Sequence, residues 1–131
     1  MSPRFTHLKR SECGAAAVEF ALVGMVAIVL FLGIIEFGRG LYMRNEMSYA
    51  ADLAARQILV NAAVANTDVE TVLRDAITFG SSTDLQITFG TESVDGIDFR
   101  TLLIRYPVSL FIPGLTNGSF TLSVGRRIPL S

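Results

Sequence analysis

The sequence predicts an α+β fold in which a long N-terminal helix and a short second helix precede a small antiparallel sheet. Three observations indicate this class. An apolar run over residues 15–35 continues into a segment whose apolar side chains recur every three or four positions. A capping-box pattern begins at Thr67, and beyond Thr83 short runs of alternating apolar and polar residues are separated by turn residues.

Composition limits the function classes. The 131 residues accommodate one domain besides the apolar run, and 11 basic against 12 acidic residues leave no basic excess for binding nucleic acid. The only histidine, lysine and cysteine are His7, Lys9 and Cys13. Beyond them the chain has no side chain for a histidine triad, a thiol nucleophile, a Schiff base or a Cys/His zinc site. We therefore expect no enzymatic activity, no metal and no cofactor.

The apolar run has the length of a membrane span. Its 21 residues, AAAVEFALVGMVAIVLFLGII, would extend about 30 Å as a helix, which matches one bilayer crossing. The 14 residues before it carry three basic side chains against one acidic, so the positive-inside rule predicts a cytoplasmic N-terminus. No small-residue cleavage site follows the run, so we expect it to be retained as an anchor in the lipid bilayer.

Glu19 is the only charged residue of this run. A carboxylate near the centre of a membrane helix costs about 2.5–3.5 kcal/mol, and less toward an edge. One interpretation is that Glu19 reaches the cytoplasmic interface or is protonated. The other is that it has a specific partner. Small residues at 15–17, Ala21 and Gly24 form a face that permits close helix approach, although they contain no GxxxG pattern.

The residues around Glu19 resemble a known signal. RSECGAAAVEFALV, followed by GIIEFGRGLYMRN, is similar to the type IV prepilin signal of TadE-like pseudopilins of the tight-adherence (Flp) pilus. The resemblance is strong from Ser11 to about Ala55 and looser over residues 106–127. It implies that a prepilin peptidase cuts between Gly14 and Ala15. Ala15, where ordinary type IV pilins have Phe or Met, favours the Tad branch.

Further expectations follow from the resemblance. Glu19 serves processing or assembly, and Phe20 occupies the aromatic position of the family. Because major Flp pilins are much shorter, the length implies a minor subunit that contributes to pilus biogenesis, adherence and biofilm formation. The implied partners are the prepilin peptidase, the major Flp pilin, sister pseudopilins, and the inner-membrane assembly platform with its ATPase. The chain would comprise a cytoplasmic leader (1–14), a transmembrane helix (15–38) and a periplasmic pilin-like domain with a helical stalk (39–131).

Two functions from other classes stay open. One is an unprocessed, signal-anchored inner-membrane protein with a small periplasmic ligand- or protein-binding domain. The start of the mature chain distinguishes it from a pseudopilin. The other is an enzyme that uses only Asp, Glu, Ser or Tyr. It would need clustered carboxylates with perturbed pKa values, and nothing in their spacing indicates such a cluster.

The helix is expected to continue from Arg39 to Ala65 because this stretch contains no proline. An apolar stripe at steps of three or four predicts the core of the downstream domain, with filament contacts as an additional use. Asp52 and Arg56 are spaced as a helical ion pair, and Glu36 and Arg39 are expected to pair at the outer membrane boundary. The stripe consists of Met43, Met47, Ala50, Ala54, Ile58, Ala62 and Ala65.

A second helix is predicted from the capping box at Thr67 to Gly80. Its expected buried face consists of Val69, Val72, Leu73, Ala76 and Ile77. Strands are predicted over residues 85–89 and 97–106, joined by a turn at Asp95-Gly96, and around 120–124 after Asn117-Gly118.

Three remaining patterns have ordinary interpretations. Glu92, Asp95 and Asp98 match no EF-hand spacing, and Asp95 already belongs to a predicted turn. The apolar segment Pro107–Leu115 is expected to form a loop. Its Phe111 and Ile112 either close the core, which we favour, or contact a partner. The basic pair Arg126-Arg127 is expected to be a solvated terminus.

Overall fold

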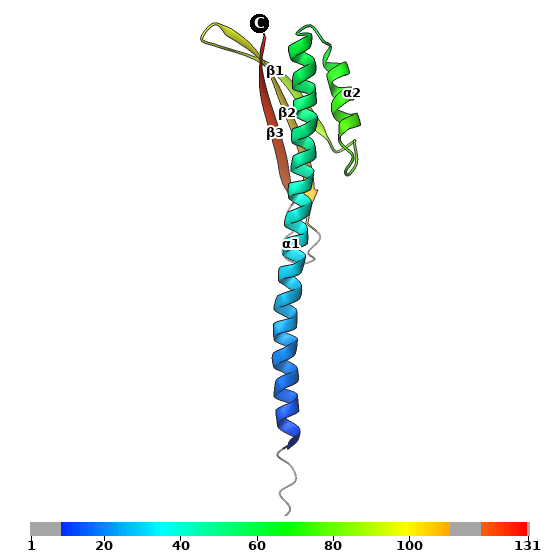
Figure 1. The fold of residues 1–131 in the computed structure, drawn as a ribbon, viewed down its shortest axis with the longest axis vertical. Coiled ribbons are helices and arrows are strands. Elements are labelled where there is room, and N and C mark those ends of the chain that lie inside the picture. The colour runs from blue at the N-terminus through cyan, green and yellow to red at the C-terminus, as the bar shows by residue number, and fades with distance from the viewer. Residues whose placement is uncertain (1–8, 111–118, 131) are drawn as a thin grey trace, which may run out of the picture. The chain divides into compact units, whose positions relative to one another are not determined.

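The computed structural model describes residues 9–110 and 119–130, and within the first helix it describes side chains from Gly14 onward. The described elements are α1 (Lys9–Val60), α2 (Asn66–Ala76), β1 (Gln86–Val94), β2 (Ile97–Ser109) and β3 (Ser119–Leu130) (Figure 1). They confirm the predicted α+β class, with a long helix, a short helix and an antiparallel sheet in that order.

The chain divides into two compact units, Met1–Phe37 and Gly38–Ser131. The described part of the first unit is the apolar half of α1. The second unit contains the rest of α1, α2 and the sheet.

Within the second unit, α1 buries the predicted stripe. Met47, Ala50, Ala54 and Ile58 have no exposed surface, and Met43 is 8% exposed. The predicted end of the helix was wrong, because α1 ends at Val60 and the positions of Ala62 and Ala65 lie beyond it and are exposed. The reason is local, since the Asn61 side chain accepts a hydrogen bond from the Ala63 N–H at 3.1 Å, an alternative to the helical pattern.

The connection from α1 to α2 is held by an arginine from the sheet. Arg100 of β2 donates from Nη1 to the carbonyls of Val64 (3.0 Å) and Ala62 (3.4 Å), and from Nη2 to Oδ1 of Asn66. These bonds satisfy backbone carbonyls of the connecting loop, which lie outside both helices.

Helix α2 begins without the predicted capping box. Ala65 is its N-cap and provides no side-chain cap, while Glu70 forms an ion pair with Arg74 at 2.7 Å. Ile77 has an extended backbone, so α2 ends at Ala76 and not at Gly80 as expected. Of the expected buried face, Val69 and Leu73 are fully buried and the other three residues are half-buried.

The sheet has the order β1-β2-β3 with both pairs antiparallel. The predicted turn is confirmed, because Asp95 (φ 53°) and Gly96 (φ 79°) both have the positive φ that a tight two-residue hairpin needs. The register places Ile104 beside Ile87 of β1 and beside Val124 of β3.

The three described strands all extend further than expected, and β1 continues to Val94 where its predicted range ended at Phe89. β2 continues to Ser109, so the first three residues of the predicted loop Pro107–Leu115 belong to the sheet. Proline is tolerated there because β1 starts opposite Arg105, which leaves Pro107 with a strand neighbour on the β3 side alone. β3 continues to Leu130 and therefore includes both arginines of the expected solvated terminus.

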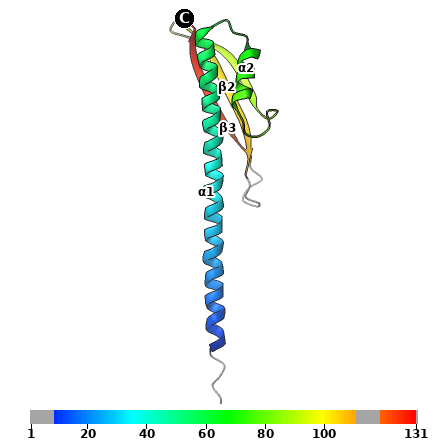
Figure 2. The ribbon, with the colours of Figure 1, turned by 45° about the vertical axis from the view of Figure 1, so that its right-hand side comes forward.

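The core lies between the sheet and the two helical segments of the second unit. Figure 2 shows α2 and the last turns of α1 on the same side of the sheet. Full burial of one large aliphatic side chain contributes about 1.5–3 kcal/mol. The buried residues of the sheet that face the helices include Leu102, Ile104, Tyr106, Val108, Val124 and Ile128.

Candidate functional site

The most prominent surface of the first unit is the apolar half of α1. Gly14–Val60 is a helix long and apolar enough to cross a membrane, and its most apolar 18 residues have a mean hydropathy of 2.7 with none of them buried. Large aliphatic and aromatic side chains from Val18 to Phe37 are exposed, and Phe20 reaches 80%. A continuous apolar surface of this size requires lipid or other protein chains around it.

The predicted processing junction lies in this exposed part of α1. Gly14, Ala15, Glu19 and Phe20 are all helical and exposed. A Cβ added at Gly14 would meet nothing within 4 Å. Ala15 and Glu19 are four residues apart and therefore share one face of the helix. Their roles in cleavage and assembly stay predictions.

The second unit begins at the predicted membrane boundary. Arg39 is half-buried and donates from Nη2 to the carbonyl of Ser109, the last residue of β2, at 2.5 Å. Glu36 is also half-buried. The pairing of Glu36 with Arg39 stays a prediction, whereas the bond to Ser109 connects the start of this unit to its sheet.

A glutamate on α1 binds the segment that follows α2. The Glu46 carboxylate accepts hydrogen bonds from the Tyr42 hydroxyl (2.5 Å), the Thr78 hydroxyl (2.8 Å) and the Thr78 N–H (3.1 Å). The Tyr42 bond is the main cause that holds the pKa of Glu46 below its usual value. This cluster was not predicted from the sequence because Thr78 is 32 positions from Glu46, although Tyr42 and Glu46 have helical i,i+4 spacing.

The expectation of a solvated terminus at Arg126-Arg127 was wrong. Arg126 donates to Asp52 of α1 at 2.7 Å, and this hydrogen bond lowers the pKa of Asp52. Arg127 pairs with Glu92 of β1 at 2.8 Å and lies over the ring of Phe99, with its guanidinium carbon 5.5 Å from the ring centre. The strand directs the two side chains to opposite faces of the sheet, so each finds a different acidic partner.

The carboxylates considered for calcium have other roles. Glu92 is paired with Arg127, and Asp95 forms the hairpin turn. Among the side chains that the structure describes, in residues 14–110 and 119–130, no three of His, Cys, Asp or Glu lie close enough together to hold a metal ion.

A small cavity of about 150 Å³ lies beside α2, with Arg74 and Tyr106 in its wall. The Arg74 guanidinium donates to Glu70 and to the carbonyls of Ser82 and Leu85. Its donors therefore hold the loop after α2, and the cavity is below the usual size range of small-molecule sites. The predicted contact residues Phe111 and Ile112 lie outside the described residues.

Residues 14–56 match the family model described as TadE-like protein. No curated protein and no solved structure matches the chain. The match covers the apolar half of α1 and nearly all of its buried half. Over these residues the chain is similar to a family of pilus structural and assembly proteins, and the matched stretch includes the helix that is long and apolar enough to cross a membrane.

Proposed function

We propose that this chain is a minor pseudopilin of the tight-adherence pilus, anchored in the bacterial inner membrane with its N-terminus in the cytoplasm and residues 39–131 in the periplasm. One observation carries the proposal. The family match over residues 14–56 includes the part of α1 whose large apolar side chains are exposed. Such a helix is suited to two environments in turn, the lipid bilayer before assembly and neighbouring helices of the pilus afterwards.

Processing after Gly14 is the first step of this function. A peptidase binds its substrate in an extended form, whereas Gly14 lies within α1, five residues after its start at Lys9. Glycine is about 0.8–1 kcal/mol less favourable than alanine inside a helix, so it facilitates local unwinding. It also places no side chain before the bond to be cut.

The new N-terminus gives Glu19 a chemical partner. Cleavage creates an ammonium group on Ala15, and a Glu19 carboxylate of a neighbouring subunit neutralises it where the dielectric is low. Association with the major Flp pilin and sister pseudopilins would proceed through this pair and the apolar helix. The assembly platform with its ATPase would supply the driving force, and the pilus would support adherence and biofilm formation.

The test compares two glycine variants in cells with and without the prepilin peptidase. Gly14→Val should leave the full precursor in the membrane, whereas Gly24→Val, at a second helical position where an added Cβ would meet nothing within 4 Å, should still yield a chain that starts at Ala15. N-terminal sequencing of membrane-extracted protein reads out both. A wild-type chain that keeps its leader in the presence of the peptidase would instead support an unprocessed membrane-anchored binding protein.

A further inference from the structure

We propose that the end of the sheet formed by the last residues of β2 and the first residues of β3 rests on the lipid surface of the bilayer that holds α1. We name this region, Val108–Leu110 with Ser119 and Phe120, the sheet base. The inference rests on the membrane-anchoring part of the proposed function and adds a second lipid-contacting element to it.

Two contacts place the sheet base at the start of the extramembrane part of α1. Arg39 donates to the carbonyl of Ser109 at 2.5 Å, and a Cβ added at Gly40 would lie 3.9 Å from the ring of Phe120. Arg39 and Gly40 follow the exposed apolar run, which ends at Phe37. Where α1 leaves the bilayer, the sheet base is therefore its immediate neighbour, and β3 begins alongside this part of α1 in Figure 1.

The charge distribution of the sheet favours lipid at this end. From Pro107 to Gly125 the sequence contains no charged residue. The opposite end, at the β1–β2 hairpin, carries Glu92, Asp95 and Asp98. The strand residues of the sheet base carry no charge and avoid the desolvation cost that ionised groups meet at a bilayer, whereas the hairpin end would bring three carboxylates to the lipid.

Exposed side chains near the sheet base have the character of membrane-interface residues. Phe120 is 39% exposed, and on the adjoining turn of α1 Leu41 is 47% and Tyr42 is 55% exposed. Tyrosine is enriched where one end of a side chain is in lipid and the other in water. Because the sheet base adjoins the residues that follow the membrane span, lipid is its expected partner. The experiment below distinguishes lipid from a neighbouring protein chain.

The chain contains no tryptophan, so a single introduced tryptophan is a site-specific fluorescent probe. We would reconstitute the full chain at low protein-to-lipid ratio in phosphatidylethanolamine and phosphatidylglycerol vesicles, with and without lipids brominated near the carbonyl end of the acyl chains. Phe120→Trp reports on the sheet base. Ile97→Trp, 51% exposed at the opposite end of β2, is the matched control, and Phe31→Trp, 66% exposed, reports on the span.

We expect brominated lipid to reduce the emission of Phe120→Trp about twofold, as for a side chain at the headgroup–acyl boundary, and to leave Ile97→Trp unchanged. Leu110→Trp should behave like Phe120→Trp and serves if the latter fails to fold. Quenching of Phe31→Trp alone would overturn the sheet-base proposal and leave the anchor intact. A blue-shifted but unquenched Phe120→Trp would mean protein contact and overturn it equally. No quenching of Phe31→Trp would refute the anchor itself.

Discussion

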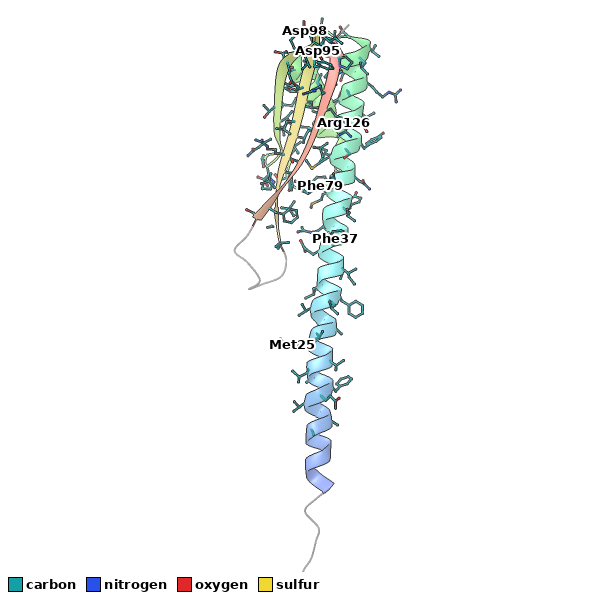
Figure 3. The ribbon with its side chains drawn as sticks, turned by 90° about the vertical axis from the view of Figure 1, so that its left-hand side faces the viewer. Met25, Phe37, Phe79, Asp95, Asp98 and Arg126 are labelled. Carbon is teal, nitrogen blue, oxygen red and sulfur yellow. The ribbon has the colours of Figure 1, made fainter. Side chains whose placement is uncertain are left out.

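The two halves of α1 bury their apolar residues in different ways, although they form one continuous helix. Before Gly38 the large apolar side chains are exposed, as the sticks at Met25 and Phe37 illustrate (Figure 3). After Gly38 the buried residues occupy one stripe against α2 and the sheet. The arrangement of apolar residues therefore separates the two roles, because an all-round apolar surface requires lipid or other helices and a single stripe requires a domain core.

The largest contrast between the halves should come from two methionines of the same helix. Met47 is fully buried and Met25 is 66% exposed. Met47→Ala should lower the free energy of unfolding by about 2–5 kcal/mol, because it removes packed volume from the core. Met25→Ala should leave it unchanged within about 0.5 kcal/mol. Urea unfolding of the full chain in detergent micelles, followed by circular dichroism, measures the free energy of unfolding of both variants. Equal losses of stability would contradict the proposed difference between the two halves of α1.

Two glycines give a smaller contrast. Gly80 has φ +66°, and a Cβ there would collide with the Tyr106 hydroxyl, whereas a Cβ at Gly24 would meet nothing within 4 Å. Gly80→Ala should therefore destabilise the second unit by about 1–3 kcal/mol. Gly24→Ala should be neutral or stabilise its helix by at most about 1 kcal/mol. Unchanged thermal melting of Gly80→Ala would show that the loop after α2 adapts without strain.

The smallest effect concerns the ion pair between Asp52 and Arg126, whose side chains are 60% and 34% exposed. Its contribution should stay below about 1 kcal/mol because solvent screens it. The pKa of Asp52 is lowered in the folded state, so the unfolded state binds more protons and stability increases with pH. The contribution is complete above the unfolded pKa of about 3.9 and is lost as the pH falls through the folded-state value.

Asp52→Asn should consequently reduce the loss of stability on acidification below about pH 4. Asp75→Asn, at an exposed aspartate of α2, controls for the removal of one negative charge. Urea midpoints of the three proteins between pH 3 and pH 7 provide the comparison. An acid response of Asp52→Asn identical to that of the wild type would exclude a contribution from this pair.

Local signals account for the parts of the fold that sequence analysis predicted. The stripe from Met43 to Ile58 and the Asp95-Gly96 turn each depend on residues within a few positions of one another. The end of α1 was missed because the side chain of Asn61 competes with the helical pattern and Arg100, far away in sequence, binds the carbonyls that follow. The spacing of apolar residues alone cannot predict a helix boundary that depends on such distant contacts.

In the candidate functional site, too, some features follow from neighbouring residues in the sequence and others depend on distant contacts. Arg126 is 74 positions from Asp52, and only the pairing of β3 with β2 explains why it faces α1 and not the solvent. Gly14 and Glu19 were identified from the resemblance of their surroundings to a prepilin signal. Their proposed partners are a peptidase and a second subunit. The structure of a single chain therefore shows that these two residues are accessible, but it does not contain the contacts through which they would act.

The exposed half of α1 is proposed to be an assembly element, and Glu19 tests this proposal most directly. Glu19→Leu makes the span more apolar, so membrane abundance and the Ala15 N-terminus should be unchanged. Loss of one member of a buried ion pair costs about 3–5 kcal/mol, so co-purification with the other pilins should be lost, and Glu19→Asp should recover it in part. Normal co-purification of Glu19→Leu from membranes would contradict the claim.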